Sequence, residues 1–155
     1  MPRYIPAPDL LAARHILVTG AGDGIGRAAA LAFAAHGASV ILLGRTASKL
    51  EKVYDEIEKR GGPQAAILPL DLAQATPAHS DQIAQTIEKE FGRLDGLLHN
   101  AADAGTLTPM ELYEPDMWYR VMQVNLHAAW LLTRACLPLL RKSGDASIVF
   151  TTADV

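Results

Sequence analysis

Short apolar runs alternate with amphipathic stretches along the chain, and most transitions fall at a glycine or a polar cluster. The apolar runs are candidate strands, at His15–Val18, Ser39–Leu43, Ala65–Leu70, Leu94–His99 and Ser147–Thr151. The second run is uniformly apolar, which is typical of a strand buried on both faces of a parallel sheet. Pro69 lies inside the third run and has no N–H for a ladder hydrogen bond. We therefore expect that strand at an edge of the sheet.

Stretches with helical periodicity separate the candidate strands. They cover Ile25–His36, a segment from Ser48 to Gly61, Ser80–Phe91 and Asp116–Lys142. Ser48 and Glu51 have the spacing of a capping box at the start of the second stretch. Pro138 lies inside the last stretch, where it should bend or interrupt the helix. Strands that alternate with helices predict an α/β fold with a parallel sheet and right-handed crossovers.

Composition narrows the class of protein. The 155 residues suffice for a single domain with a substantial core, and 50% of them are hydrophobic and 20% charged, as in a soluble globular protein. The net charge of −3 argues against nucleic acid or an anionic membrane as a partner. The single cysteine, Cys136, suits the reducing cytoplasm, and no run reaches the ~18 apolar residues of a membrane span. The histidines show no metal-ligand spacing, so we expect no metal site.

The clearest chemical signal is the segment Thr19-Gly20-Ala21-Gly22-Asp23-Gly24-Ile25-Gly26, between the first strand and the first helix. Gly20 permits a tight turn, Gly24 lets a pyrophosphate approach the helix N-terminus, and Gly26 lets the helix lie close to the sheet. The glycine spacing differs from G-x-G-x-x-G, and an ordinary strand-to-helix turn is the alternative interpretation. Because strand, turn, helix and a further strand follow in order, we expect this segment to bind a nucleotide.

Arg45 bears on the choice of nucleotide. Ligands of parallel sheets bind at the carboxyl ends of the strands, and a residue just beyond the second strand faces the adenosine ribose. An arginine there offers a planar donor fork to the 2′-phosphate of NADP, whereas a carboxylate would accept a hydrogen bond from the 2′-OH of NAD. Arg45 therefore favours NADP over NAD. A solvated loop arginine is the alternative, and Asp23 in the glycine turn is a contrary signal.

Four features have the order and spacing of the short-chain dehydrogenase/reductase family, which the chain resembles from about Leu10 to its last residue. They are Thr19-Gly20-x-x-x-Gly24-Ile25-Gly26, Asp71-Leu72, Asn100-Ala101-Ala102 and Val124-Asn125-Leu126. The resemblance extends to bacterial uncharacterised oxidoreductases with Leu-His-Asn-Ala and Ile-Val-Phe-Thr stretches. It implies a Rossmann-like, doubly wound parallel sheet that is truncated after the fifth strand, with residues 1–155 as one NAD(P)-binding domain.

The resemblance also implies roles for individual residues. The turn at Gly24–Gly26 would hold the pyrophosphate, and Asp71 would accept a hydrogen bond from the adenine amino group beside the Leu72 backbone. Asn100, with the two alanines that follow it, would support the central strand and the cofactor pocket. Asn125 resembles the helix-kinking asparagine that orders a water in the proton relay. Outside the family, a helix N-cap, a turn residue and a solvated helix position are the respective alternatives for Asp71, Asn100 and Asn125.

Departures from the family pattern concern catalysis. The family glycine after Asn100-Ala101 is Ala102 here, which crowds the nicotinamide side slightly. At the end of the fifth strand Ala153 falls on the serine that polarises the substrate carbonyl, and Thr152 takes that role only if the register shifts by one residue. The family's general acid is a tyrosine in Tyr-x-x-x-Lys, and none of the 4 tyrosines has a lysine at that spacing. The chain as given is expected to be a truncated version that is inactive alone.

The leading hypothesis is a cytoplasmic NADP-dependent oxidoreductase that moves a hydride between the nicotinamide and a small carbonyl or alcohol substrate, with this chain holding the cofactor. The stretch Asp116–Lys142 is apolar on several faces, which makes a homo-oligomer the expected state. One alternative is a nucleotide-binding pseudoenzyme or sensor, which Ala153 supports. The other is an inactive fragment.

Overall fold

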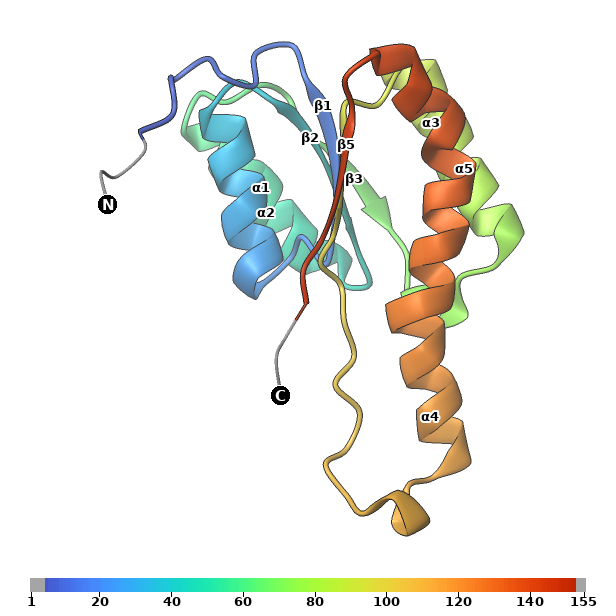
Figure 1. Ribbon diagram of the computed structural model, residues 1–155. Coiled ribbons are helices and arrows are strands. Elements are labelled where there is room, and N and C mark those ends of the chain that lie inside the picture. The colour runs from blue at the N-terminus through green and yellow to red at the C-terminus, as the bar shows by residue number, and fades with distance from the viewer. Residues whose placement is uncertain (1–4, 153–155) are drawn as a thin grey trace.

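A computed structural model describes residues 5–152 and contains a parallel sheet between two layers of helices (Figure 1). Its five strands are β1 (His15–Thr19), β2 (Ser39–Gly44), β3 (Ala66–Pro69), β4 (Gly96–His99) and β5 (Ser147–Phe150). All neighbours pair in parallel, in the order β3-β2-β1-β4-β5. This order confirms the predicted α/β, Rossmann-like fold. The prediction that the strand with Pro69 lies at an edge is also confirmed, because β3 pairs only with β2.

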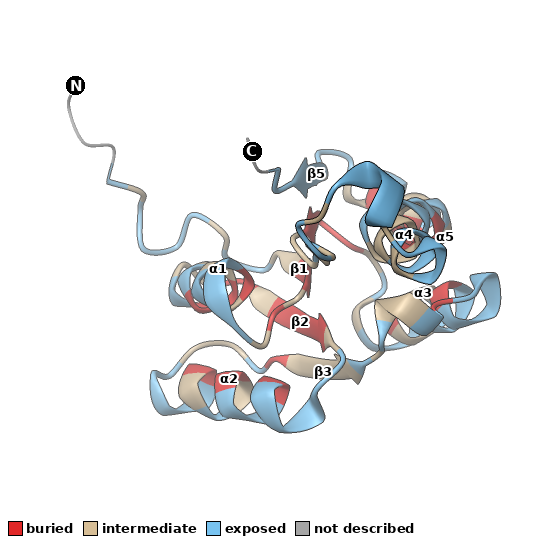
Figure 2. Ribbon diagram, turned by 90° about the horizontal axis from the view of Figure 1, so that it is seen from below, coloured by how far each residue is buried: buried red, intermediate tan, exposed pale blue. Residues whose placement is uncertain are grey.

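Helices cover both faces of the sheet (Figures 1 and 2). They are α1 (Gly24–Ala35) and α2 (Ala47–Lys59) on one face, and α3 (Pro77–Phe91) and α5 (Ala128–Ser143) on the other. Val18 and Leu42 belong to the core under α1 and α2, whereas Leu17, Ile41 and Leu43 belong to the core under α3 and α5. Successive side chains of a strand point to opposite faces, so a strand covered on both sides must be apolar at every position. This explains the uninterrupted apolar runs.

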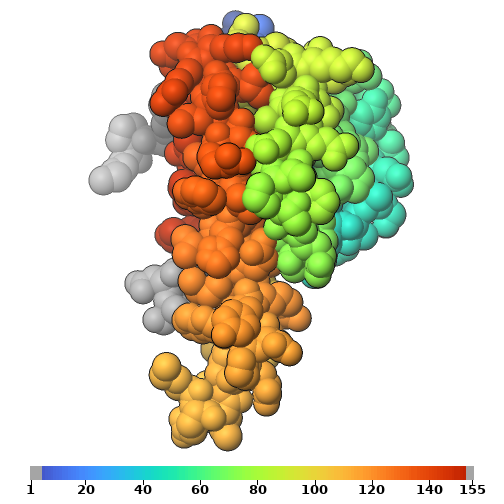
Figure 3. Space-filling model, turned by 90° about the vertical axis from the view of Figure 1, so that its right-hand side faces the viewer, coloured from blue at the N-terminus to red at the C-terminus, as the bar shows by residue number. Residues whose placement is uncertain are grey.

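Shorter helical segments complete the chain. They are η1 (Leu72–Gln74), η2 (Met110–Leu112), α4 (Pro115–Met122) and the π-helix η3 (Gln123–His127). Figure 3 shows α4 and α5 forming one side of the molecule next to α3. In the described part of the chain, no helix combines the length and the apolar character needed to cross a membrane.

The irregular turn of the long helical region lies at η3 and not at Pro138. The sequence predicts a bend or an interruption at Pro138, and the interruption is wrong, because α5 continues through the proline from Ala128 to Ser143. A proline inside a helix removes one hydrogen bond, and burial of its neighbours offsets that loss. Cys136 and Leu139 on either side of the proline are buried in the core against α3. Burial also raises the pKa of the Cys136 thiol to about 12, so this cysteine is an inert core residue.

The starts of two helices differ from the sequence prediction. The predicted capping box at Ser48 and Glu51 is wrong, since Thr46 is the N-cap of α2 and makes no side-chain capping hydrogen bond. The helix predicted from Ser80 begins at Pro77. There the Thr76 hydroxyl accepts a hydrogen bond from the backbone N–H of His79, and the fixed φ of a proline suits the first helical position.

Candidate functional site

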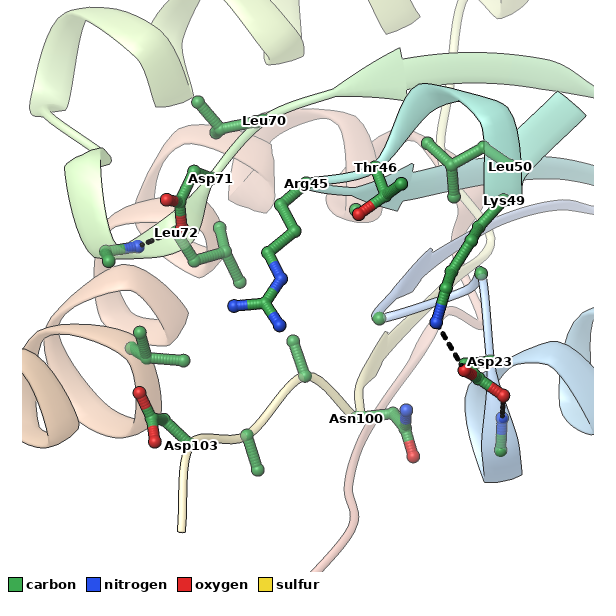
Figure 4. Close-up of a pocket in the computed structure, with 18 of the residues that line it drawn as sticks. Asp23, Arg45, Thr46, Lys49, Leu50, Leu70, Asp71, Leu72, Asn100 and Asp103 are labelled. Carbon is green, nitrogen blue, oxygen red and sulfur yellow. Dashed lines mark hydrogen bonds and ion pairs between the residues drawn. The ribbon is translucent and has the colours of Figure 1, made fainter. Parts of the chain in front are cut away.

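A pocket of about 870 Å³ opens at the carboxyl ends of the strands (Figure 4). Its walls come from four segments that each follow a strand: the glycine turn after β1, the β2–α2 loop, residues 70–74 after β3 and residues 100–104 after β4. Because the strand order reverses at β1, the connections on its two sides lead away from each other and leave a crevice between them. Arg120 and Val124, from α4 and η3, complete the lining.

Most residues predicted to bind a cofactor line this pocket. They are Gly20, Gly22, Asp23, Gly24, Ile25, Arg45, Asp71, Leu72, Asn100, Ala101 and Ala102. Thr19, Gly26 and Asn125 are not part of the lining but contact residues that are, as described below. Thr152 is exposed after β5 and is not part of the lining, and Ala153 lies outside the described residues.

Thr19 holds the turn after β4 in place from its buried position at the end of β1. Its hydroxyl accepts hydrogen bonds from the backbone N–H of Asn100 at 2.9 Å and of Ala101 at 3.0 Å. The same hydroxyl donates to the carbonyl oxygen of Leu98 at 3.3 Å. One buried side chain thus satisfies two backbone donors that would otherwise lack a partner at the point where β4 ends.

Two glycines allow the N-terminus of α1 to lie at the pocket. A Cβ on Gly26 would collide with the carbonyl oxygen of Gly20 and with the side chain of Asn100, so only glycine permits this close approach. Gly24 has a φ of +50°, and a Cβ built there would meet no atom within 4 Å. The N-terminus of α1 therefore presents an unobstructed backbone at the pocket, where the helix dipole favours an anion.

Two ion pairs lie around the pocket. Lys49 pairs with Asp23 at 2.6 Å, and Arg120 pairs with Asp103 at 2.8 Å. The hydrogen bond from Lys49, followed by that from the Gly24 N–H, lowers the pKa of Asp23. The Gly105 N–H and then Arg120 lower the pKa of Asp103. Both carboxyl groups are therefore ionised at neutral pH, and each has a cation as its partner.

Arg45 is the remaining cation at the pocket. Its side chain extends from the end of β2 into the space between the glycine turn and Asp103 (Figure 4). Among residues 5–152, its guanidinium takes part in no hydrogen bond or ion pair that meets normal distance and angle limits. The fork of donors is thus available to an anionic ligand.

Asp71 serves as the N-cap of η1, which was the alternative interpretation of this residue. Its Oδ1 accepts a hydrogen bond from the backbone N–H of Ala73 at 3.0 Å. A carboxylate can accept several hydrogen bonds, so capping leaves acceptor capacity for a ligand. The side chain can therefore serve as a cap and as a ligand contact together.

Asn125 lies in η3, and its side-chain amide forms two hydrogen bonds with the backbone of Asp103. Its Oδ1 accepts from the Asp103 N–H at 2.8 Å, and its Nδ2 donates to the Asp103 carbonyl oxygen at 2.9 Å. Asp103 lines the pocket, so Asn125 ties the π-helix to the segment that follows β4. Asn125 is exposed, and these two hydrogen bonds give it a defined partner that a helix residue contacting only water would not have.

Sequence reasoning missed three charged residues of this site, namely Lys49, Asp103 and Arg120. A signal was present for Lys49, because it lies in the first turn of the helix that follows β2, close in sequence to the carboxyl end of that strand. No local signal marks Arg120, whose position depends on the path of the chain from β4 to α4.

The chain matches the family described as short chain dehydrogenase over residues 14–155. It is 49% identical over 152 residues to the uncharacterised oxidoreductase YciK of Escherichia coli K12, which covers 98% of this chain and 60% of that protein. The crystal structure of the short chain dehydrogenase from Shigella flexneri has a TM-score of 0.93 and 49% identity, covering 97% of this chain and 59% of that one.

A structure from Escherichia coli CFT073, solved in complex with NADPH, has a TM-score of 0.92 and 49% identity over 96% of this chain and 62% of that one. The chain thus spans about 60% of the length of the relatives it matches. The match extends from before β1 to beyond β5 and includes all four features on which the resemblance was based. This chain belongs to the short-chain dehydrogenase family.

Proposed function

We propose that this chain is the cofactor-binding part of an NADP-dependent oxidoreductase, which transfers a hydride between the nicotinamide and a carbonyl or alcohol substrate. The observation that carries the proposal is Arg45, whose guanidinium lies in the pocket after β2 and has no partner among the described residues 5–152. Two similar structures, from Escherichia coli CFT073 and Shigella flexneri 2a strain 301, contain NADPH and NADP respectively, and support the same cofactor here. In this proposal residues 1–155 form one NAD(P)-binding domain, and Cys136 as the only cysteine favours the cytoplasm.

The pocket suits a phosphorylated dinucleotide. Its volume of about 870 Å³ is in the range of cofactor sites. Residues Gly20–Gly26, with Thr19 beneath them, would hold the pyrophosphate at the open N-terminus of α1. Asp71 and Leu72, at the end of β3, would receive the adenine. Asn100, Ala101 and Ala102, after β4, would lie along the nicotinamide half.

In this proposal the chain's own residues orient the cofactor and donate a hydrogen bond to the substrate carbonyl. A bound NADP(H) supplies or accepts the hydride. Asn125 would act as a positioning residue, since it holds the backbone of Asp103 and with it the wall formed by residues 100–104. Thr152 has a hydroxyl that could donate a hydrogen bond to the substrate carbonyl, which Ala153 lacks. We therefore propose Thr152 for that role.

Titration of NADPH and NADH against the 155-residue chain tests the cofactor assignment. The unmutated chain should bind NADPH more tightly. Arg45→Ala should lose about 1.5–3 kcal/mol of NADPH affinity, roughly ten- to a hundredfold, and little NADH affinity. Arg141→Ala, an exposed arginine in the last turn of α5, is the control and should change neither. Equal affinity of the unmutated chain for both cofactors would overturn the NADP assignment.

A second candidate is nucleotide binding without catalysis, as a pseudoenzyme, a sensor or an inactive fragment. The favouring observation is Ala153, which falls at the position of the family serine and has no hydroxyl to polarise a substrate carbonyl. A missing donor to the substrate oxygen typically costs about 10²–10³ in kcat, so this candidate predicts nucleotide binding with little or no turnover. An NADPH-oxidation assay over a panel of aldehydes and ketones checks this expectation, and measurable turnover would contradict it.

A further inference from the structure

We propose that Lys49 is a specificity-determining residue of this site: it neutralises Asp23 and, together with Arg45, provides the cationic environment for the 2′-phosphate of NADP. The inference rests on the proposed function and adds a residue outside the four family features named above. Three observations carry it, namely how Lys49 is held, which charge it offsets, and where it lies relative to Arg45.

Packing on two sides holds the backbone of Lys49 beside the pocket. It lies in the first turn of α2, directly before Leu50, whose side chain is fully buried in the core. On the other side, a Cβ placed on Gly22 would lie 3.0 Å from the Cβ of Lys49. The glycine turn therefore rests against the stem of the lysine. The backbone and the Cβ of Lys49 are thus held by packing, and its exposed ammonium is positioned by the pair with Asp23.

Lys49 offsets the negative charge that Asp23 places at the pocket. The Asp23 carboxylate caps α1, with Oδ1 accepting from the Gly24 N–H at 2.8 Å, and it also lines the pocket. An uncompensated carboxylate at this place would repel a phosphate dianion. The Lys49 ammonium donates to the Oδ2 of Asp23 at 2.6 Å and cancels that charge. The contrary signal that Asp23 presents in the sequence is thereby removed.

Arg45 and Lys49 approach the pocket from the same segment. Figure 4 shows the arginine extending toward the Asp103 side and the lysine toward Asp23, with Thr46 between their starting points. The Thr46 side chain lines the pocket and makes no capping hydrogen bond, so its hydroxyl is available as a third donor. An ammonium has three N–H donors, and the pair with Asp23 leaves others for a ligand. A ribose that faces this segment with a 2′-phosphate gains charge-assisted contacts that a 2′-hydroxyl cannot form.

A purely structural role for Lys49 gives a different expectation. If the pair with Asp23 only fastens α2 to the glycine turn, then breaking it loosens the turn that would hold the pyrophosphate. Binding of every adenine nucleotide would then weaken alike. If the proposal is right, only ligands with a 2′-phosphate are affected.

The experiment compares adenosine 2′,5′-bisphosphate with adenosine 5′-monophosphate, which differ only in the 2′-phosphate. Both are titrated by calorimetry against the full 155-residue chain and its variants. Lys49→Met should weaken binding of the bisphosphate about tenfold, as expected for one charge-assisted contact, and leave that of the monophosphate unchanged. Lys52→Met, an exposed lysine on the same helix, is the matched control and should affect neither probe.

Two further variants separate charge from structure. Asp23→Asn combined with Lys49→Met should recover the part of the lost bisphosphate affinity that comes from repulsion by the Asp23 carboxylate, while the part that comes from the direct contact of Lys49 stays lost. Lys49→Arg keeps the positive charge and should retain the preference for the bisphosphate over the monophosphate. This variant tests the proposal even if Lys49→Met does not fold.

The outcomes distinguish this inference from the proposed function. Equal weakening of both probes by Lys49→Met, or no weakening of either, would overturn the role of Lys49 while leaving the NADP assignment intact. If the unmutated chain binds the two probes equally or binds neither, the proposed function itself fails, and the role of Lys49 fails with it.

Discussion

Replacing Thr19 by valine tests how the end of β1 supports the pocket. Valine keeps the branched shape of threonine and removes the hydroxyl. Thr19 is only 1% exposed. Its hydroxyl accepts hydrogen bonds from the backbone N–H groups of Asn100 and Ala101 and donates one to the carbonyl oxygen of Leu98. The substitution leaves both donors and one acceptor without their partner.

The size of the effect follows from these three hydrogen bonds. A buried donor left unsatisfied costs about 1–3 kcal/mol. Asn100 and Ala101 are half-buried, so water replaces part of each lost bond. We expect Thr19→Val to lower the free energy of unfolding by about 2–3 kcal/mol, a large part of the roughly 5–15 kcal/mol of a typical domain. Nucleotide affinity should also fall, because the side chain of Asn100 lies against the glycine turn.

Urea denaturation followed by circular dichroism measures the stability change. The control is Thr86→Val, since the Thr86 hydroxyl bonds only to the Gln82 carbonyl on the exposed side of α3. That variant should stay within about 0.5 kcal/mol of the unmutated chain. A Thr19→Val chain that is as stable as the Thr86→Val control would refute the view that this hydroxyl holds the turn after β4.

Three further predictions concern other parts of the chain. Asp71→Ala should weaken NADPH and NADH alike and keep stability within about 1 kcal/mol; a large loss of stability with unchanged affinity would make Asp71 only a cap. Burial lowers the pKa of His99 to about 4, below the ~6.5 of an unfolded histidine. The unfolded chain therefore binds the proton first, so stability should fall as the pH drops from about 6.5 to about 4, and His99→Gln should flatten that part of the urea-midpoint curve. Val149, Phe150 and Trp130 are each more than half exposed, so size-exclusion chromatography should show species larger than a monomer, and a monodisperse monomer would contradict this.

The order of the elements could be predicted from the sequence because it depends on local pattern. An apolar run such as Ser39–Leu43 avoids water on both faces only in a sheet covered by helices on both sides, and β2 lies in such a sheet. Pro69 could be assigned to an edge because it lacks one N–H group. The glycine turn and Arg45 were found for the same kind of reason. They follow strands of a parallel sheet, and the carboxyl ends of such strands share one edge.

The tertiary structure alone decided which side chains meet at that edge. Asp23 lies in the glycine turn and Lys49 in α2, and their pairing depends on how closely that turn approaches α2. Asn125 likewise acquires its role only when η3 comes beside Asp103. Sequence pattern reports the periodicity and chemistry of one segment, whereas such contacts depend on the distance between segments. That distance is set by the packing of helices on the sheet, which no single segment encodes.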